Sequence, residues 1–273
     1  MSNEKVLRAK DISIVFGGLT AVDHFNMEIG QNELVGLIGP NGAGKTTVFN
    51  ILTGVYTPTS GEYEFDGKNV DKVHTYKLVQ SGIARTFQNI RLFSKMSVLD
   101  NVIVANNFNM EYKPLTGAFR LPAFWKEEKR EREEALKLLS IFDLDQYADV
   151  DAENLPYGQQ RKLEIARAMS TKPKLLLLDE PAAGMNPKET EELMETIRLI
   201  RDKFNISILL IEHDMKLVLG ICERIIVLDH GKIIAQGDPI ETVNDPRVVT
   251  AYLGTAEDAE ELEDKVEETE EVK

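Results

Sequence analysis

A glycine-rich segment of nine residues has the residue types and spacing that bind phosphate. It reads Gly39-Pro40-Asn41-Gly42-Ala43-Gly44-Lys45-Thr46-Thr47 and follows the apolar run Leu34–Ile38. Its glycines let backbone N–H groups turn toward phosphate oxygens, in conformations that side chains would obstruct. Lys45 would neutralise the charge of the β- and γ-phosphates, and the Thr46 hydroxyl would ligate Mg²⁺. A plain glycine-rich turn is disfavoured, because a strand-like run precedes the segment and a helix-like run, Lys45–Leu52, follows it. We therefore predict a nucleoside triphosphate site.

Two adjacent carboxylates, Asp179 and Glu180, follow a run of four leucines from Leu175 to Leu178. Such a run is typical of a central parallel strand, whose carboxyl end is where α/β sheets bind ligands. Asp179 would hold Mg²⁺ through its water shell, and Glu180 would polarise the water that attacks the γ-phosphate. Neighbouring strand residues point in opposite directions, so both acids can serve only if the chain turns there, as Pro181 suggests. Taken alone, the pair fits a solvated strand end equally well.

The elements that must position these residues alternate between strand-like and helix-like patterns, as in an α/β protein. An antiparallel β layer is predicted at the start of the chain, and a helical subdomain at residues 97–170. We expect residues 106–125 to be irregular because of Pro114, Gly117 and Pro122. The predicted strands are residues 6–16, 24–29, 33–38, 62–65, 175–179, 206–211, 225–229 and 232–236, and the later helices are residues 187–204 and 216–222.

Composition excludes several classes of protein. The chain has 273 residues, enough for one large or two small domains. No apolar run approaches the roughly 18 residues that span a bilayer, and no signal segment begins the chain, so we expect a cytoplasmic protein unless a membrane partner holds it. Cys222 lies among apolar residues, which predicts a buried, inert thiol.

The net charge of −14 disfavours a nucleic-acid surface. Much of it comes from the last 18 residues, which hold eight Glu and two Asp against two Lys. Such a composition predicts a solvated, disordered tail that aids solubility. A docking role for the tail is the alternative.

The order of these motifs resembles that of the ATP-binding subunits of ABC transporters, and the resemblance covers residues 6–254. It implies a P-loop NTPase of the ABC type, α/β in class, with an antiparallel β layer and a helical subdomain inserted in the nucleotide-binding core. The ATP-binding domain would span residues 1–254, followed by the acidic tail at residues 255–273. The implied ligands are ATP and Mg²⁺.

The resemblance also implies roles for residues that carry no signal by themselves. Phe16 stands where the family stacks an aromatic ring on adenine. Gln88 stands at the hinge glutamine, which senses Mg²⁺ and the attacking water and links to the membrane partner, and His213 at the switch histidine, which contacts the γ-phosphate. Asn186 lies in the loop through which two subunits communicate. The signature segment, which faces the partner's ATP, would be Leu155, Pro156, Tyr157, Gly158 and Gln159.

Two positions depart from the family's pattern. The usual signature is Leu-Ser-Gly-Gly-Gln, whereas here Pro156 replaces the serine and Tyr157 the first glycine. Losing the serine removes a polar contact worth about 0.5–1.5 kcal/mol net when neutral, or about 1.5–3 kcal/mol when one partner is charged. Asn186 stands where an aspartate is common. Together these departures predict two non-identical ATP sites.

Four segments resemble those of the larger ATPase subunit of branched-chain amino-acid importers. They are residues 16–22, residues 84–89, Tyr157-Gly158-Gln159-Gln160-Arg161 and the communication loop Ala183-Gly184-Met185-Asn186-Pro187. The implied partners are a second related ATPase, two membrane permeases and an external solute-binding protein, which would place the chain at the cytoplasmic face of the membrane. Residues 106–125, with Phe108, Phe119, Phe124 and Trp125, would shape the permease-docking face or cap the subdomain's own core. The alternatives are the ATPase of a urea or short-amide importer and that of a lipid or polysaccharide exporter. A regulatory module without turnover is disfavoured, because Glu180 and His213 are both present.

Overall fold

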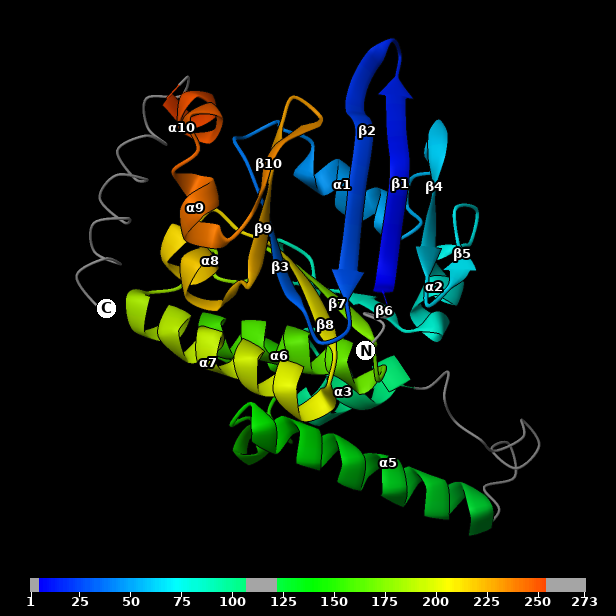
Figure 1. The fold of residues 1–273 in the computed structure, drawn as a ribbon. Helices are drawn as coiled ribbons and strands as arrows, with labels where there is room; N and C mark the ends of the chain where they lie inside the picture. Colours follow the sequence, from blue (N-terminus) through cyan, green and yellow to red (C-terminus); the bar gives the residue numbers. More distant parts are fainter. Residues whose placement is uncertain (1–4, 107–121, 254–273) are drawn as a thin grey trace.

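The computed structural model describes residues 5–106 and 122–253, which form two β-sheets and the helices around them (Figure 1). The smaller sheet is antiparallel and has the strand order β2-β1-β4-β5. Gly17 and Gly18 turn the chain between its first two strands at φ values of 52° and 90°, which glycine adopts without steric cost. The predicted antiparallel layer is confirmed. Its strands are β1 (Lys5–Phe16), β2 (Leu19–Gly30), β4 (Ser60–Phe65) and β5 (Lys68–Asn69).

The larger sheet has six strands in the order β10-β9-β3-β8-β7-β6. Its first five strands along the chain run parallel, and only β10 is antiparallel to its neighbour. The five-residue strands β3, β7 and β8 are buried at every position. The strands are β3 (Leu34–Ile38), β6 (Ile83–Arg85), β7 (Leu175–Asp179), β8 (Ser207–Ile211), β9 (Arg224–Asp229) and β10 (Lys232–Gly237).

The four leucines of β7 show why this sheet needs cover on both faces. Leu175 and Leu177 belong to one core, shared with α1 (Lys45–Leu52) and the antiparallel sheet. Leu176 and Leu178 belong to the other core, shared with α6 (Tyr157–Ser170), α7 (Pro187–Phe204) and α8 (Met215–Ile221). Each buried leucine contributes about 1.5–3 kcal/mol relative to an exposed one.

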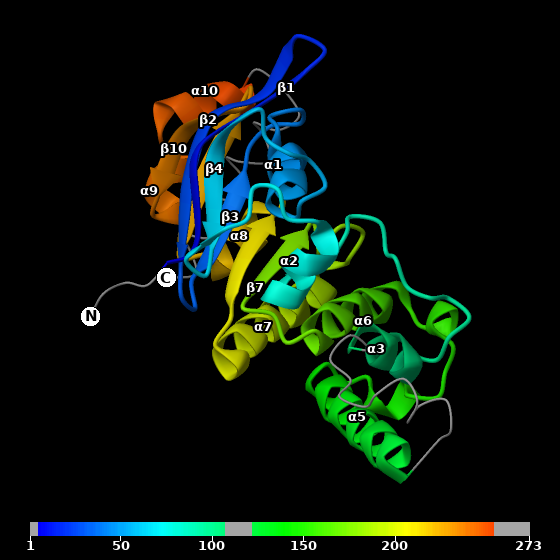
Figure 2. The same cartoon turned by 90° about the vertical axis from the view of Figure 1, so that its right-hand side faces the viewer.

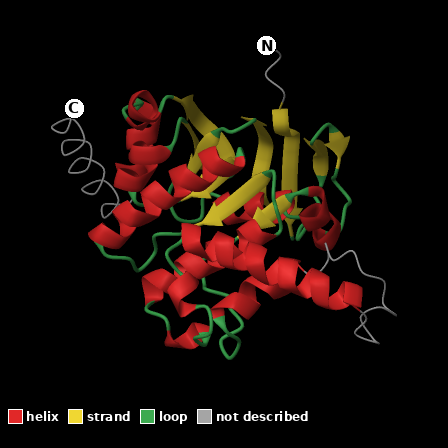
Figure 3. Ribbon diagram, turned by 90° about the horizontal axis from the view of Figure 1, so that it is seen from below, coloured by secondary structure: helices red, strands yellow, loops and turns green. Residues whose placement is uncertain are grey.

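The helices α3 (Val98–Asn106), α5 (Pro122–Ile141) and α6 pack against one another next to the parallel sheet. Figure 2 shows α5 at the end of the molecule opposite the antiparallel strands. Seen from below, the strands of both sheets lie in the upper part of the view and long helices cross its lower part, with further helices beside the strands (Figure 3). Two short 3-10 turns, Asp145–Tyr147 and Ala152–Asn154, lead from α5 into α6.

The prediction of an irregular stretch at residues 106–125 is wrong at its end. Pro122 is the first residue of α5, and Phe124 and Trp125 lie inside that helix. Proline fits a helix start, because the first N–H groups have no acceptor within the helix. Residues 107–121, with Phe108 and Phe119, lie outside the described residues, as does the acidic tail. Three helices and two strands were not predicted: α2 (Thr75–Ser81), β5, β6, α9 (Pro239–Val243) and α10 (Pro246–Leu253).

Cys222 is buried, as predicted, and burial raises the pKa of its thiol, which keeps it protonated. Among the described residues, no helix combines the length and the apolar character needed to cross a bilayer.

Candidate functional site

Four neighbouring parallel strands deliver the predicted site residues to one edge of the larger sheet. The phosphate loop follows β3, Gln88 follows β6, Asp179 and Glu180 end β7, and His213 follows β8. The carboxyl ends of parallel strands meet at the same edge, which is where sheets of this class bind ligands. The chain thus brings together residues that lie up to 174 positions apart.

The phosphate loop has the backbone that its glycines predicted. Gly39, Gly42 and Gly44 all have positive φ values, of 146°, 80° and 105°. A Cβ atom on Gly39 would lie 1.9 Å from the Leu228 carbonyl oxygen, so no side chain fits there, whereas one on Gly42 would face open space. Lys45 Nζ donates to the carbonyl oxygens of Gly39 and Pro40, at 2.6 and 2.9 Å. The loop is therefore folded around its own lysine, which lies at the start of α1.

Glu180 lies at the centre of the site's hydrogen bonds. Its φ of 47° turns the chain directly after β7, as the two neighbouring acids required. Gln88 Nε2 donates to Glu180 Oε2 at 2.6 Å, and His213 Nε2 lies 3.0 Å from Glu180 Oε1. Because an ionised carboxylate only accepts, the histidine donates through Nε2–H. The expected hinge glutamine and switch histidine thus both contact Glu180, and these three residues are the expected catalytic group.

Asp179 is buried and bonds a residue outside this cluster. Its Oδ2 atom accepts from Arg85 Nη2 at 2.7 Å, and Arg85 also donates to Asn50 Oδ1 at 2.7 Å. The Arg85 guanidinium lies over the rings of Phe49 and Phe87. Sequence reasoning assigned no role to Arg85, because its contact with Asp179 depends on the pairing of β6 with β7.

Glu212, the residue before His213, is a second buried acid that sequence reasoning missed. Its carboxylate accepts from the backbone N–H groups of Ala182 at 2.8 Å, His213 at 3.0 Å and Asp214 at 3.4 Å. Burial raises the pKa of Glu212 to about 7, against the opposing effect of these donors. Glu212 therefore ties the turn after Glu180 to the loop that carries His213.

Phe16 lies at the end of β1 with its ring about half exposed. Tyr56 contacts it edge-on, with ring centroids 5.2 Å apart and an interplanar angle of 67°. This arrangement fixes one edge of the Phe16 ring and leaves the pair accessible to a planar ligand. Tyr56 carried no recognisable signal in the sequence.

The signature segment leads into α6. Pro156 occupies the N-cap position, so no side chain caps this helix as a serine would, and the exposed Tyr157 begins it. A Cβ on Gly158 would lie 2.8 Å from Glu189 Oε1, and one on Gly184 would lie 3.2 Å from the Tyr157 ring. The segment consequently packs against the predicted communication loop.

Asn186 is the N-cap of α7. Its side chain accepts from Glu189 N–H at 3.0 Å, and Glu189 Oε2 accepts from Asn186 N–H at 2.9 Å. Asparagine and aspartate serve this capping role about equally well. The departure from aspartate at this position therefore keeps the helix start intact.

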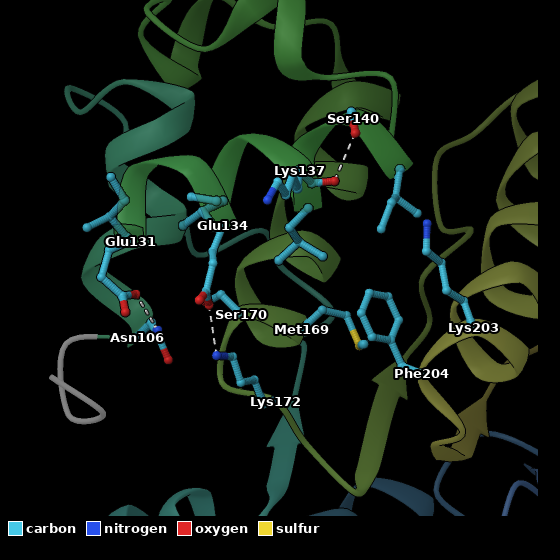
Figure 4. A pocket seen from close by; sticks show the side chains of 15 residues that line it. Asn106, Glu131, Glu134, Lys137, Ser140, Met169, Ser170, Lys172, Lys203 and Phe204 are labelled. Atoms are coloured by element: carbon cyan, nitrogen blue, oxygen red, sulfur yellow. Dashed lines mark hydrogen bonds and ion pairs between the residues drawn. The ribbon is translucent and has the colours of Figure 1, made fainter. Parts of the chain in front are cut away.

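An apolar pocket of about 480 Å³ lies elsewhere, between α3, α5, α6 and the end of α7 (Figure 4). Its lining includes Met169, Leu138 and Phe204, together with several lysines and glutamates. It contains none of the predicted phosphate, magnesium or catalytic residues, so it is separate from the site at the sheet edge.

The residues at this edge fit a nucleoside triphosphate with a divalent cation. The phosphate loop offers a glycine-rich backbone, Lys45 and the N-terminus of α1, all of which favour anionic oxygens. Thr46 is exposed and carries a hydroxyl, and the Gln88 amide and the Asp179 carboxylate supply further oxygen ligands of the kind Mg²⁺ prefers.

Comparison with known proteins agrees with this geometry. Residues 22–183 match the family model described as ABC transporter, and residues 232–258 match the one described as branched-chain amino acid ATP-binding cassette transporter. The high-affinity branched-chain amino acid transport ATP-binding protein BraF of Pseudomonas aeruginosa is 45% identical over 92% of this chain and 98% of its own length. The corresponding Escherichia coli protein, LivG, is 45% identical over 93% of this chain and all of its own.

More distant relatives share the same cassette. The lipopolysaccharide export system ATP-binding protein LptB of Haemophilus influenzae is 30% identical over 91% of this chain and 97% of its own. The crystal structure of the ADP conformation of MJ1267, an ATP-binding cassette of an ABC transporter, superposes with a TM-score of 0.80 at 32% identity, over 92% of this chain and 99% of that one.

Proposed function

The chain belongs to the ABC transporter family of ATP-binding proteins, and from this we propose that it is the ATP-hydrolysing subunit of a branched-chain amino-acid importer. The observation that carries the proposal is the contact of Gln88 and His213 with the two oxygens of Glu180, at the edge where the phosphate loop lies. The match of residues 232–258 to the branched-chain amino acid model supports the class of solute.

ATP would bind along the edge of the sheet with its phosphates on residues 39–47. Gly39, Pro40, Asn41, Gly42, Ala43, Gly44, Lys45, Thr46 and Thr47 form the loop that wraps the phosphates, and adenine would stack on Phe16. Lys45 Nζ now bonds two backbone carbonyls, and it would exchange them for phosphate oxygens. Because an ammonium binds an anionic oxygen more strongly than a neutral carbonyl, this exchange favours the bound state.

Glu180 would then act as the general base. Each of its oxygens accepts one bond, from Gln88 or from His213, and retains a second lone pair for the attacking water. The two donors hold the carboxylate in one orientation, which is the geometric requirement for proton abstraction. His213 would orient the γ-phosphate as well, since it lies at the neighbouring strand end.

Thr46, Gln88 and Asp179 would hold Mg²⁺, which neutralises charge on the phosphates when bound. Gln88 uses its amide N–H₂ on Glu180, so its carbonyl oxygen is the atom left for the cation. Asp179 keeps Arg85 on one oxygen, and its other oxygen would serve the water shell of the cation.

We propose that the chain works in a pair with a second, related ATPase. Leu155, Pro156, Tyr157, Gly158 and Gln159 would face the partner's ATP, and Asn186 lies in the loop that would relay between the subunits. ATP would hold the pair closed, and its hydrolysis would release the pair. Because Pro156 offers no hydroxyl, the two ATP sites would be unequal.

The remaining partners would be two membrane permeases and an external solute-binding protein, and the chain would then lie at the cytoplasmic face of the membrane. Residues 1–254 would form the ATP-binding domain, with the helical subdomain at about residues 97–170, and residues 255–273 the acidic tail. The higher identity to branched-chain amino acid proteins, 45% against 30% for LptB, favours this solute class over a lipid or polysaccharide.

Reconstitution tests the proposal. The chain is assembled with its candidate ATPase partner and permeases in liposomes, and ATP-dependent leucine uptake is measured with and without binding protein. We expect uptake and ATP hydrolysis to be lost together in Glu180→Gln, which keeps the side chain's shape but removes the base. ATP hydrolysis without leucine movement would redirect the solute assignment to urea, an amide or an exported lipid.

A further inference from the structure

Gln88 is held by more than its contact with Glu180. The Arg161 side chain, on α6, is 1% exposed and reaches the loop after β6. Arg161 Nη1 donates to the Phe87 carbonyl oxygen at 2.7 Å, and Nη2 donates to that of Gln88. Since the guanidinium fork is planar and rigid, two adjacent carbonyls fix the backbone of Gln88 in both position and orientation.

A buried acid keeps this arginine in place. Glu164, one turn further along α6, is 1% exposed and lies with its Oε2 atom 3.1 Å from Arg161 Nη1. Its other oxygen accepts the backbone N–H of Arg91 at 3.1 Å. The Arg161–Glu164 pair therefore clamps residues 87–91 to α6 from two points, with the charge of each member balanced by the other.

The unusual signature residue Tyr157 joins the same cluster. Arg161 Nη2 lies 3.3 Å from the Tyr157 hydroxyl, and the guanidinium lies 5.7 Å from the ring centroid. The ring also lies close to the communication loop, because a Cβ on Gly184 would lie 3.2 Å from it. A glycine at position 157 could make none of these contacts, so they give the departure from the family's signature a structural purpose.

We propose that Arg161 is a positioning residue that aligns Gln88 with Glu180 and, through Tyr157, links this alignment to the signature segment. The inference rests on the proposed role of Glu180 as the base. A continuous series of contacts then links α6 to the residues of hydrolysis. The series runs from Gly184 through Tyr157 and Arg161 to the backbone of Gln88, and from the Gln88 side chain to Glu180.

The test measures kcat and KM for ATP in the reconstituted complex, together with nucleotide affinity and melting temperature of the full-length chain. Arg161→Gln combined with Glu164→Gln removes both charges, so neither remains buried alone. We expect kcat to fall about tenfold or more, because small misplacements of catalytic groups are that costly, while KM and the nucleotide Kd stay within about twofold. Phosphate binding does not involve either residue.

Arg161→Lys provides a second variant that retains the buried charge. Lysine can satisfy one carbonyl well but not both in the fork geometry, so we expect a kcat between those of the native chain and the double variant. Arg167→Gln is the matched control. Arg167 also lies on α6 and donates to a backbone carbonyl of this loop, but the carbonyl belongs to Arg91 and not to Gln88. We therefore expect kcat of this variant to stay within about twofold of native.

The outcomes separate the two proposals. Glu180→Gln is measured in the same preparation, and hydrolysis that survives it would overturn the proposed function itself. If Glu180→Gln is inactive but both Arg161 variants keep native kcat, the positioning role is wrong. A rise in KM or Kd with unchanged kcat would also refute it, because it would place Arg161 in nucleotide binding.

Discussion

Replacing Arg85 with methionine should destabilise the chain, because it leaves the Asp179 carboxylate buried without a partner. The Arg85 and Asp179 side chains are 9% and 6% exposed, and the two atoms of the ion pair lie 2.7 Å apart. Removing one member of a buried pair costs about 3–5 kcal/mol. Methionine retains the length of the side chain but loses the donors to Asp179 and to Asn50. We therefore expect a loss of about 4 kcal/mol in the free energy of unfolding.

Scanning calorimetry without nucleotide measures this loss. An unfolding entropy of about 2.1 cal/mol/K per residue gives about 0.6 kcal/mol/K for a chain of this length. A loss of about 4 kcal/mol should therefore lower the melting temperature by about 7 °C. We expect the unpaired Asp179 charge, rather than lost packing, to cause this drop in melting temperature.

The double variant Arg85→Met with Asp179→Asn isolates the charge. It replaces the unpaired Asp179 carboxylate with a neutral amide, so at least half of the lost unfolding free energy should return. The effects of the two substitutions would then be strongly non-additive in a double-mutant cycle. Two results would refute the reasoning. Arg85→Met could melt within about 2 °C of the native chain, or the double variant could be as unstable as the sum of the two single variants.

Two further predictions concern the pH dependence of stability and the stacking of adenine on Phe16. The raised pKa of Glu212 means that the folded state holds a proton up to about pH 7 that the unfolded state releases near 4.5, so native stability falls as pH rises through this window. In Glu212→Gln this slope disappears, and its unfolding free energy relative to native should rise by up to about 1.4 kcal/mol per pH unit in denaturant titrations; parallel pH curves would contradict it. Phe16→Ala should weaken ATP binding about fivefold or more in fluorescence titrations, since aromatic stacking on a base is worth about 1–3 kcal/mol, whereas Leu19→Ala, next to it at the exposed turn, should leave the Kd unchanged.

Local patterns predicted the parts of the fold that carry a strong periodic or positional signal. The bounds of α1, α7 and β7 agree with prediction, because each has clear apolar spacing and a definite breaker at its ends. The three-residue strand β6 was missed, since it is too short for any period to show. Pro122 was taken as a breaker although it begins a helix, because position within an element decides what proline does.

The same distinction between local and long-range signals holds for the candidate site. Glycine spacing and strand ends predicted the phosphate loop, Asp179 and Glu180 from neighbouring residues alone. The partners of these groups could not be predicted in this way, because Arg85 meets Asp179 across 94 positions and Arg161 meets the Gln88 loop across 73. Such contacts exist only once the sheet order is set.

The buried charges at this edge serve geometry more than stability. An apolar core would hold the same loops together, and replacing a buried ion pair by apolar residues is often neutral or stabilising. Apolar attraction is non-directional, however, whereas hydrogen bonds are directional. Arg85 bonds the end of β7, and Arg161 and Glu212 bond defined atoms of neighbouring loops. The strands bring Gln88, Glu180 and His213 to one edge. The buried contacts of Arg85, Arg161 and Glu212 then fix how the segments at this edge face one another. Variants at these positions should therefore lower the rate of hydrolysis more than they weaken the binding of phosphate. The kcat and KM measurements on the Arg161 variants test this difference.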